Sequence, residues 1–215
     1  MEAPENKRSV SAKMRIVGSS AHSLTERHHQ EFYATNSNDV QVFLDQLSRD
    51  KITLSPKVWE PACGEGHIAK KLPGEVLATD LHDRGYGEVL DFFEASEIFA
   101  GDIITNPPYK GNIDIRFVRK AMELVEPGRY VMMLFKTIWQ ASKGRFLLFQ
   151  EYPPKYIYNY SYRIKIHKNG DGKSNNALDY AWYIWQKGFQ GETTTRFIPS
   201  PKWFGYENFT NGTVK

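Results

Sequence analysis

Four consecutive residues, Asn106-Pro107-Pro108-Tyr109, have the clearest chemical meaning in this sequence. The two prolines fix the backbone and lack N–H donors, so the turn presents carbonyl oxygens. The Asn106 amide oxygen and the Pro107 carbonyl can accept both N–H bonds of a planar NH2 group and direct its lone pair at an electrophile. Tyr109 can stack on a flat substrate. These four residues therefore predict catalysis on an exocyclic or amide NH2 group, with a structural Pro-Pro turn as the alternative.

A second candidate site is a turn that contains Gly64 and Gly66, which allow a ligand to approach the backbone closely. The third glycine of the dinucleotide fingerprint is missing, and so is a P-loop lysine, which disfavours a pyrophosphate or triphosphate ligand. Asp80 follows where ribose-binding acids lie in nucleotide folds. Asp91 next to Phe92 offers an acceptor and a ring for adenine. The set favours an adenosyl ligand, although each acid taken singly is better explained as a helix cap or a solvated charge.

Alternating strand and helix patterns must position these residues. Repeated βα units predict a mostly parallel α/β sheet covered by helices on both faces, and its ligands bind beyond the carboxyl ends of the strands. The expected strands span 57–60, 75–80, 102–105, 130–135, parts of 155–167, and 180–185. The expected helices span 38–50, with Ser37 and Asn38 as capping candidates, then 67–72, 113–125 and 138–150. Trp182 and Trp185 are expected to pack in the core.

The 215-residue length and 40% hydrophobic content predict one folded domain. We expect a flexible arm over 1–25, the main domain over 26–198 and a tail over 199–215. The sequence lacks an apolar run of membrane-helix length and a signal-peptide pattern, which favours a cytoplasmic protein. The single cysteine, Cys63, excludes an internal disulfide, and no metal site is expected, the His28-His29 pair included.

Charge is distributed unevenly along the chain. Residues 1–128 hold 15 Lys/Arg against 20 Asp/Glu, a net charge of −5, whereas residues 129–215 hold 13 against 5, a net charge of +8. A basic second half can face a polyanion such as nucleic acid, or can be an ordinary solvated surface. Tyrosines 152, 156, 158, 160 and 162 interleave with the basic residues, which suits phosphate contact and base stacking. The candidate DNA-binding residues are Lys110, Lys143, Arg145, Arg163, Lys165, Lys168 and Lys173.

On these motifs the sequence resembles the class I S-adenosylmethionine-dependent DNA adenine-N6 methyltransferases, in particular the small stand-alone kind of phages and prophages. The resemblance covers residues 30 to about 198 and implies a Rossmann-like, mostly parallel seven-stranded sheet. It identifies 60–66 with the first cofactor motif and 106–109 with the catalytic motif. It also identifies 32–35 with the segment that closes over the methionine end of the cofactor, although Asn36 stands where many relatives have proline. The cofactor-binding residues that the resemblance implies are Phe32, Tyr33, Thr35, Glu60, Pro61, Ala62, Gly64, Gly66, Asp80, Leu81, Asp91, Phe92 and Asn106.

The implied reaction is methyl transfer from S-adenosylmethionine to N6 of an adenine flipped out of DNA. Larger members of the family carry a separate target-recognition domain, for which only residues 150–176 are available here, so relaxed target specificity is expected. Three alternatives remain at this stage. The same turn could methylate adenine in RNA or the amide of a protein glutamine, and the chain could be a non-catalytic antirestriction module that binds S-adenosylmethionine and DNA. The oligomeric state, monomer or dimer, is left open.

Overall fold

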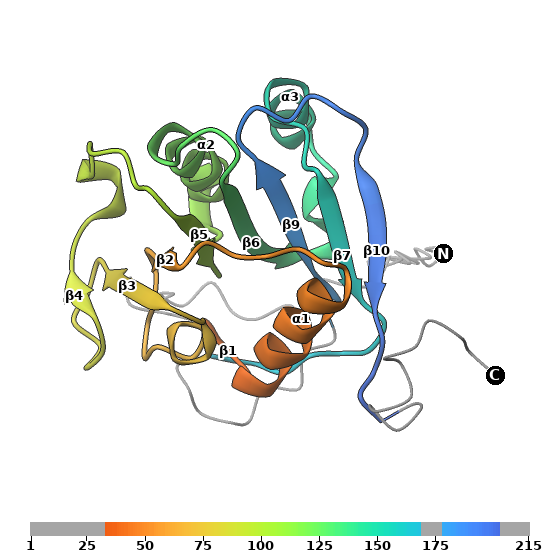
Figure 1. Ribbon diagram of the computed structural model, residues 1–215, viewed down its shortest axis with the longest axis horizontal. Coiled ribbons are helices and arrows are strands. Elements are labelled where there is room, and N and C mark those ends of the chain that lie inside the picture. The colour runs from red at the N-terminus through yellow and green to blue at the C-terminus, as the bar shows by residue number, and fades with distance from the viewer. Residues whose placement is uncertain (1–32, 169–177, 203–215) are drawn as a thin grey trace, which may run out of the picture. The chain divides into compact units, whose positions relative to one another are not determined.

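An eight-stranded sheet in the order β10-β7-β9-β6-β5-β2-β3-β4 forms the centre of the computed structural model, which describes residues 33–168 and 178–202 (Figure 1). Neighbouring strands are parallel except for the pairs that β9 makes with β6 and β7. In chain order the strands are β2 (Lys57–Glu60), β3 (Glu75–Asp80), β4 (Glu88–Val89), β5 (Asp102–Thr105), β6 (Tyr130–Lys136), β7 (Tyr156–Tyr160), β9 (Tyr180–Gln186) and β10 (Thr194–Ile198). The expected mostly parallel α/β sheet is confirmed, with eight strands instead of seven.

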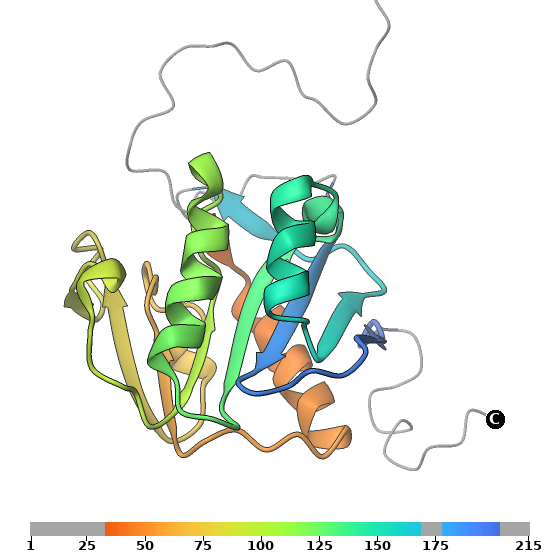
Figure 2. The same cartoon turned by 90° about the horizontal axis from the view of Figure 1, so that it is seen from above.

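Helices cover both faces of this sheet, and a small second sheet lies apart from it. Helix α1 (Ser37–Arg49) lies on one face, while α2 (Ile113–Leu124) and α3 (Lys143–Glu151) lie on the other (Figures 1 and 2). Strands β1 (Tyr33–Thr35) and β8 (Ile166–Lys168) pair antiparallel with each other. The short 3-10 helices are η1 (Ala69–Lys71), η2 (Phe92–Glu94), η3 (Lys110–Asn112) and η4 (Thr137–Gln140). None of the helices in the described ranges is long and apolar enough to cross a membrane.

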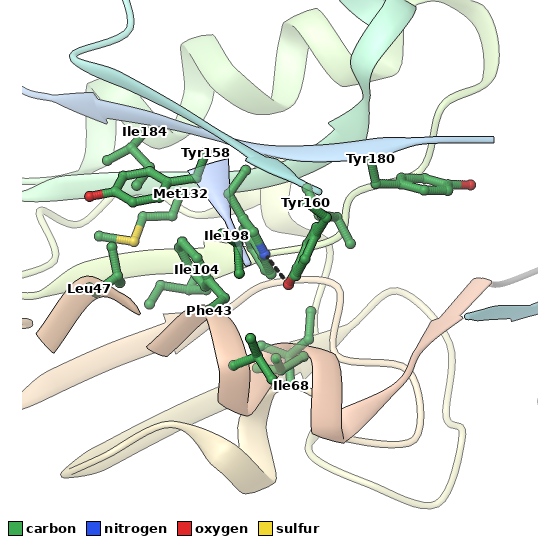
Figure 3. Packing of buried hydrophobic residues seen from close by; sticks show 14 of the residues in the cluster. Phe43, Leu47, Ile68, Ile104, Met132, Tyr158, Tyr160, Tyr180, Ile184 and Ile198 are labelled. Carbon is green, nitrogen blue, oxygen red and sulfur yellow. Dashed lines mark hydrogen bonds between the residues drawn. The ribbon is translucent and has the colours of Figure 1, made fainter. Parts of the chain in front are cut away.

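Two apolar layers form the core, one on each face of the sheet. Along β6, Met132 and Leu134 pack into the layer that contains α1, whereas Val131, Met133 and Phe135 pack into the layer that contains α2 and α3. This alternation is the two-residue period of a strand buried on both faces. Figure 3 shows the layer under α1.

The two tryptophans of β9 follow the same alternation. Trp182 packs in the layer under α1 and Trp185 in the opposite layer, both without exposed surface, as expected from the sequence. The indole N–H of Trp182 donates a hydrogen bond of 2.9 Å to the Tyr160 hydroxyl (Figure 3). A buried tryptophan whose N–H is paired contributes apolar burial without an unsatisfied polar group. Both residues are therefore structural.

Three of the expected helices have different boundaries in the structure, two because of local capping and one because its segment is short. Asn36, not Ser37 or Asn38, caps α1, because its side chain accepts a hydrogen bond from the Asn38 N–H. The helix expected at 138–150 is divided at Ser142, whose extended backbone and hydroxyl cap the start of α3. The helix expected at 67–72 is reduced to the three residues of η1, since the segment between Gly66 and Pro73 is too short for a stable α-helix.

The strands at the two edges of the large sheet were not expected from the sequence. β4 has only two residues, and β10 is mostly exposed, so neither has an alternation long enough to recognise. Within 155–167 the strand pattern also divides, because β7 belongs to the large sheet and β8 pairs with β1. The expected arm at 1–25 and most of the expected tail at 199–215 lie outside the described residues.

Candidate functional site

The candidate site lies along the edge of the sheet where the parallel strands β2, β3 and β5 end. Glu60 is the last residue of β2, Asp80 is the last residue of β3, and Asn106 follows β5 directly. Parallel strands bring their carboxyl ends to one edge, where ligands of such folds bind. The structure thus brings the glycine turn, Asp80 and the Asn-Pro-Pro-Tyr turn to the same edge, as expected.

Asp80 connects β3 to the glycine turn. One carboxylate oxygen accepts a hydrogen bond from the Gly64 N–H at 2.9 Å, and the other accepts from the His82 N–H at 3.0 Å. Each carboxylate oxygen has a second lone pair, so two acceptor positions remain for hydroxyl groups of a ligand. Asp80 is therefore fixed by backbone donors and can still bind a ribose diol.

Backbone geometry in the turn after β2 requires glycine. Gly64 and Gly66 have φ values of 55° and 77°, in the region that glycine adopts most readily. A Cβ atom at Gly66 would lie 2.4 Å from the Tyr86 ring, so the position also requires the absence of a side chain. Pro61 is buried and Ala62 is half-buried at the start of the turn. Both glycines are buried, and their N–H groups donate to the Asp80 carboxylate and to the Cys63 carbonyl oxygen, so the turn is tightly packed.

Acidic groups are concentrated under this turn. Glu60 is buried and accepts a 2.6 Å hydrogen bond from the Ala69 N–H. Burial raises its pKa well above the ordinary value, the Ala69 hydrogen bond opposes this rise, and the Asp80 carboxylate adds to it. Burial, followed by the charges of Glu60 and Asp80, raises the pKa of Cys63 to about 12, so the thiol stays protonated. A cationic ligand at this turn would reduce the repulsion between the carboxyl groups.

The three residues expected around an adenine ring differ in exposure and in their contacts. Asp91 caps η2 by accepting a 2.9 Å hydrogen bond from the Phe93 N–H, which is the alternative explanation considered above. Phe92 is only 2% exposed and packs against Trp59 and Phe117, so it offers little surface to a ligand. Leu81 is exposed. The contact of these residues with adenine stays a prediction.

The Asn-Pro-Pro-Tyr turn is held by hydrogen bonds at both of its ends. The Asn106 amide nitrogen donates to the Tyr33 carbonyl oxygen at 3.0 Å and to the Thr35 hydroxyl oxygen at 3.1 Å. The Tyr109 hydroxyl lies within hydrogen-bond distance of the Asn106 Oδ1 atom and 3.0 Å from the Leu134 carbonyl oxygen. Burial raises the pKa of Tyr109 well above its ordinary value, so its hydroxyl stays protonated and acts as a donor.

Strand β1 brings the segment that the resemblance assigns to cofactor closure against the catalytic turn. Tyr33 is 42% exposed and its ring lies 6.4 Å from the Tyr109 ring, while Thr35 is buried. Phe32, the other aromatic residue of that assignment, lies outside the described residues. The contact of β1 with Asn106 could not be expected from sequence. The position of β1 depends on its pairing with β8, from Thr35 with Ile166 to Tyr33 with Lys168, and pairing between three-residue strands so far apart in sequence has no periodic signal.

Three of the basic residues expected to bind DNA are exposed near this edge. Strands β6 and β7 run in the same direction, because both are antiparallel to β9. Lys143 follows the carboxyl end of β6, and Arg163 and Lys165 follow that of β7, all three exposed. Arg163 lies 3.8 Å from the Asp179 carboxylate in an exposed pair. The side chains of Lys110 and Lys168 are not described, and Lys173 lies outside the described residues.

The Arg145 side chain is 21% exposed and pairs with a buried acid. Its guanidinium lies 2.6 Å from the carboxylate of Asp114, which has no exposed surface and also accepts a 2.6 Å hydrogen bond from the Trp139 indole N–H. The guanidinium also lies over the Trp139 ring, 5.4 Å from its centroid. This arrangement favours a structural role for Arg145 over the expected contact with DNA.

The tyrosines of the 150–162 region are also more structural than expected. Tyr158 and Tyr160 are 0% and 6% exposed, and their hydroxyls donate to the Asp50 carboxylate at 2.6 Å and to the Asp39 carbonyl oxygen at 2.8 Å. The Tyr162 hydroxyl donates to the Asp39 carboxylate at 3.1 Å. The prediction that Tyr158 and Tyr160 stack on bases is therefore wrong, because both rings lie in the core under α1.

One charged residue of the site was not expected. The Arg84 guanidinium lies 3.6 Å from the Asp80 carboxylate, and the two side chains are only 16% and 13% exposed. Their spacing of four residues resembles a helical ion pair, but the segment is a loop, where spacing does not predict contact. Arg84 thus partly neutralises the acid expected to bind ribose.

The sequence matches no protein-family model. It has no significant match among curated proteins either. The structure, in contrast, is similar to many solved ones. It aligns with a protein of Listeria monocytogenes assigned to the class I S-adenosylmethionine-dependent methyltransferases, at a TM-score of 0.54 and 14% identity, over 78% of this chain and 67% of that one.

Two restriction-modification proteins are also similar in structure. The modification subunit assigned to a type I restriction enzyme of Vibrio vulnificus aligns with a TM-score of 0.51 and 13% identity, and the type IIG restriction endonuclease BpuSI aligns with 0.53 and 14%. The alignments cover 80% and 75% of this chain but only 48% and 26% of those proteins. The chain therefore has the Rossmann-like fold of class I S-adenosylmethionine-dependent methyltransferases.

Proposed function

We propose that this protein transfers a methyl group from S-adenosylmethionine to N6 of an adenine flipped out of DNA. The observation that carries the proposal is the Asn106 to Tyr109 turn, which follows β5 directly at the edge that also holds Glu60 and Asp80. An NH2-binding turn and an adenosyl-binding turn on one edge of this fold fit a single reaction between their two ligands. The similarity in fold to restriction-modification proteins supports a nucleic-acid substrate.

The residues of the first turn fit S-adenosylmethionine. Gly64 and Gly66 allow the tight turn after β2, Asp80 has acceptor lone pairs for the ribose hydroxyls, and its carboxylate suits a cationic ligand. When bound, the cofactor supplies an electrophilic methyl group on a sulfonium. Pro61, Ala62, Leu81 and Asp91 belong to the same proposed cofactor surface, together with Tyr33, whereas the Thr35 hydroxyl accepts a hydrogen bond from Asn106.

The catalytic turn holds the substrate amine. Asn106 Oδ1 and the Pro107 carbonyl oxygen accept its two N–H bonds and direct the nitrogen lone pair at the methyl carbon. With the cofactor bound, N6 would form a bond to that carbon as the carbon–sulfur bond broke, and the extra proton would leave N6 for solvent. Tyr109 stacks on the base with its ring while its hydroxyl donates to Asn106 Oδ1. Lys143, Arg163 and Lys165 contact phosphates.

The burial of Tyr158 and Tyr160 removes part of the argument for nucleic acid, so two other candidate substrates are kept. The same two acceptors would also hold the NH2 group of adenine in RNA or of a glutamine side chain in a protein. All three substrates have a delocalised, weakly nucleophilic lone pair, and the turn alone does not discriminate among them.

The test is a transfer assay with labelled S-adenosylmethionine and three substrates: duplex DNA, RNA and a mixture of proteins. We expect label in DNA, recovered as N6-methyladenine after digestion, and no transfer by Asn106→Ala, which should still bind the cofactor. Label only in RNA or only in protein would replace DNA with that substrate. Salt-dependent DNA binding without transfer to any substrate would favour the non-catalytic antirestriction module.

A further inference from the structure

The side-chain amide of Asn106 has a defined orientation. One end of it lies 3.0 Å from the Tyr33 carbonyl oxygen and 3.1 Å from the Thr35 hydroxyl oxygen. A carbonyl oxygen only accepts hydrogen bonds, so the NH2 end of the amide, and not its oxygen, must face β1. Asn106 Oδ1 is thereby left on the opposite side, next to the Tyr109 hydroxyl.

Both N–H bonds of the amide are used by these two acceptors. If the amide turned over, Oδ1 would face the Tyr33 carbonyl oxygen, acceptor against acceptor, and the NH2 group would face the Tyr109 hydroxyl. Thr35 is only 2% exposed, so water has little access to replace a lost contact there. The Thr35 hydroxyl is the one side-chain group among the two acceptors, and therefore the one that substitution can remove.

Long-range contacts hold these acceptors in place. β1 pairs with β8. One more backbone hydrogen bond extends this pairing, from the Asn36 N–H to the Lys165 carbonyl oxygen at 3.2 Å. Asp39, in the first turn of α1, accepts hydrogen bonds from the Lys165 N–H at 3.3 Å and from the Tyr162 hydroxyl at 3.1 Å. The position of Thr35 beside Asn106 is thus set by the segment between β7 and β8.

We propose that Thr35 is a positioning residue that orients the catalytic amide. Its hydroxyl, with the Tyr33 carbonyl oxygen, holds Asn106 so that Oδ1 is offered to the substrate amine; the catalytic consequence rests on the proposed function. One lone pair of Oδ1 is used by the Tyr109 hydroxyl, and the other remains for the substrate. With the amide reversed, NH2 would meet NH2 and the substrate amine would lose one of its two acceptors.

Thr35→Val and Thr35→Ser separate this role from packing. Valine keeps the shape of threonine but has no hydroxyl, whereas serine keeps the hydroxyl. We expect Thr35→Val to lower kcat for methyl transfer about tenfold, the size of one lost hydrogen bond, with the dissociation constant of S-adenosylmethionine and the KM for DNA changed less than about twofold. Thr35→Ser should restore kcat to within about threefold of the wild type.

A second readout does not depend on turnover. In 15N-labelled protein the side-chain NH2 signals of Asn106, identified by their absence in Asn106→Ala, should exchange slowly with solvent in the wild type and in Thr35→Ser, and faster in Thr35→Val. If the wild type transfers no methyl group but this exchange pattern holds, the proposed function fails and the orienting contact stands. Unchanged exchange in Thr35→Val, or a loss confined to S-adenosylmethionine binding, would overturn the positioning role.

Discussion

Asn106 takes part in opposite kinds of hydrogen bond at its two ends, which makes its side chain sensitive to a change of a single atom. Its nitrogen faces two acceptors on β1, and its oxygen faces a tyrosine hydroxyl. Asparagine satisfies both ends, whereas aspartate, of the same shape, satisfies only one. The residue type, and not only its position, is therefore required by the structure.

Asn106→Asp should lower methyl transfer by more than about 100-fold and the free energy of unfolding by about 1–3 kcal/mol, because a carboxylate oxygen would face the Tyr33 carbonyl. Transfer assays and urea denaturation measure the two effects. Asn112→Asp, at an exposed position after the same turn, is the matched control and should change neither much. Full activity in Asn106→Asp would refute the assigned hydrogen bonds.

Glu60 predicts a pH dependence of stability. Its folded-state pKa is raised, mainly by burial, so between the unfolded value of about 4.3 and the raised value the native state binds more protons than the unfolded state. The stability of the wild type should therefore fall as pH rises through this window.

Glu60→Gln removes this titration and keeps an acceptor for the Ala69 N–H. We expect the variant to lose less thermal stability between pH 5 and pH 8 than the wild type does, as measured by the midpoint of thermal unfolding. Glu123→Gln, at an exposed position on α2, should behave like the wild type. An equal loss in Glu60→Gln would contradict the pKa shift.

At the scale of elements, one partly buried ion pair connects α2 to α3 behind the catalytic turn. Asp114 on α2 binds both Arg145 on α3 and Trp139 on η4, and Trp139 stacks on Phe135 of β6 at a centroid distance of 3.9 Å. The Phe135 ring in turn contacts the Tyr109 ring at 6.0 Å. Through these contacts, α2 and α3 support the Tyr109 ring from the side of β6.

Asp114→Ala should lower the free energy of unfolding by about 3 kcal/mol, because it leaves the Arg145 charge and the Trp139 N–H unpaired in the interior. The matched control is Glu151→Ala, which breaks the exposed 2.7 Å pair with Arg119 between the same two helices and should cost less than about 1 kcal/mol. Denaturant titration compares them. Equal costs would show that the Asp114 pair adds nothing beyond a surface contact.

Elements with long or clear patterns could be predicted from the sequence, and those that depend on distant partners could not. The strands β2, β3, β5, β6 and β9 and the helices α1 and α2 have periodic apolar residues and were expected within a few positions. The two-residue β4, the exposed β10 and the pairing of β1 with β8 have no such signal. Local motifs were enough to select Asn106 and Asp80 as candidate site residues. The pairing of Arg145 with Asp114 could not be predicted, because it joins residues that only the folded chain brings together.

At the scale of the whole molecule, the acidic and basic halves of the sequence both contribute residues to one edge of the sheet. The acidic first half contains Glu60 and Asp80 of the proposed cofactor turn, and the basic second half contributes Lys143, Arg163 and Lys165 next to the same edge. Binding that relies on phosphate contacts should depend strongly on salt.

We expect three single substitutions to weaken DNA binding: Lys143→Ala, Arg163→Ala and Lys165→Ala. If each side chain neutralises one phosphate, each substitution should also reduce the slope of the logarithm of the binding constant against the logarithm of the salt concentration by about 0.9. Fluorescence anisotropy at several salt concentrations measures the slope. Lys51→Ala, an exposed change at the end of α1 and near the opposite edge of the sheet, should leave it unchanged. Slopes that are the same in all four variants would exclude this surface as the DNA contact.

The most direct test of the central claim is to express the protein in a bacterium that lacks DNA methylation and to map N6-methyladenine across its genome. The account predicts N6-methyladenine at a short motif or at many scattered adenines with the wild type, and none with Asn106→Ala at equal protein level. A genome without N6-methyladenine, in cells that contain folded wild-type protein able to bind S-adenosylmethionine, would contradict it.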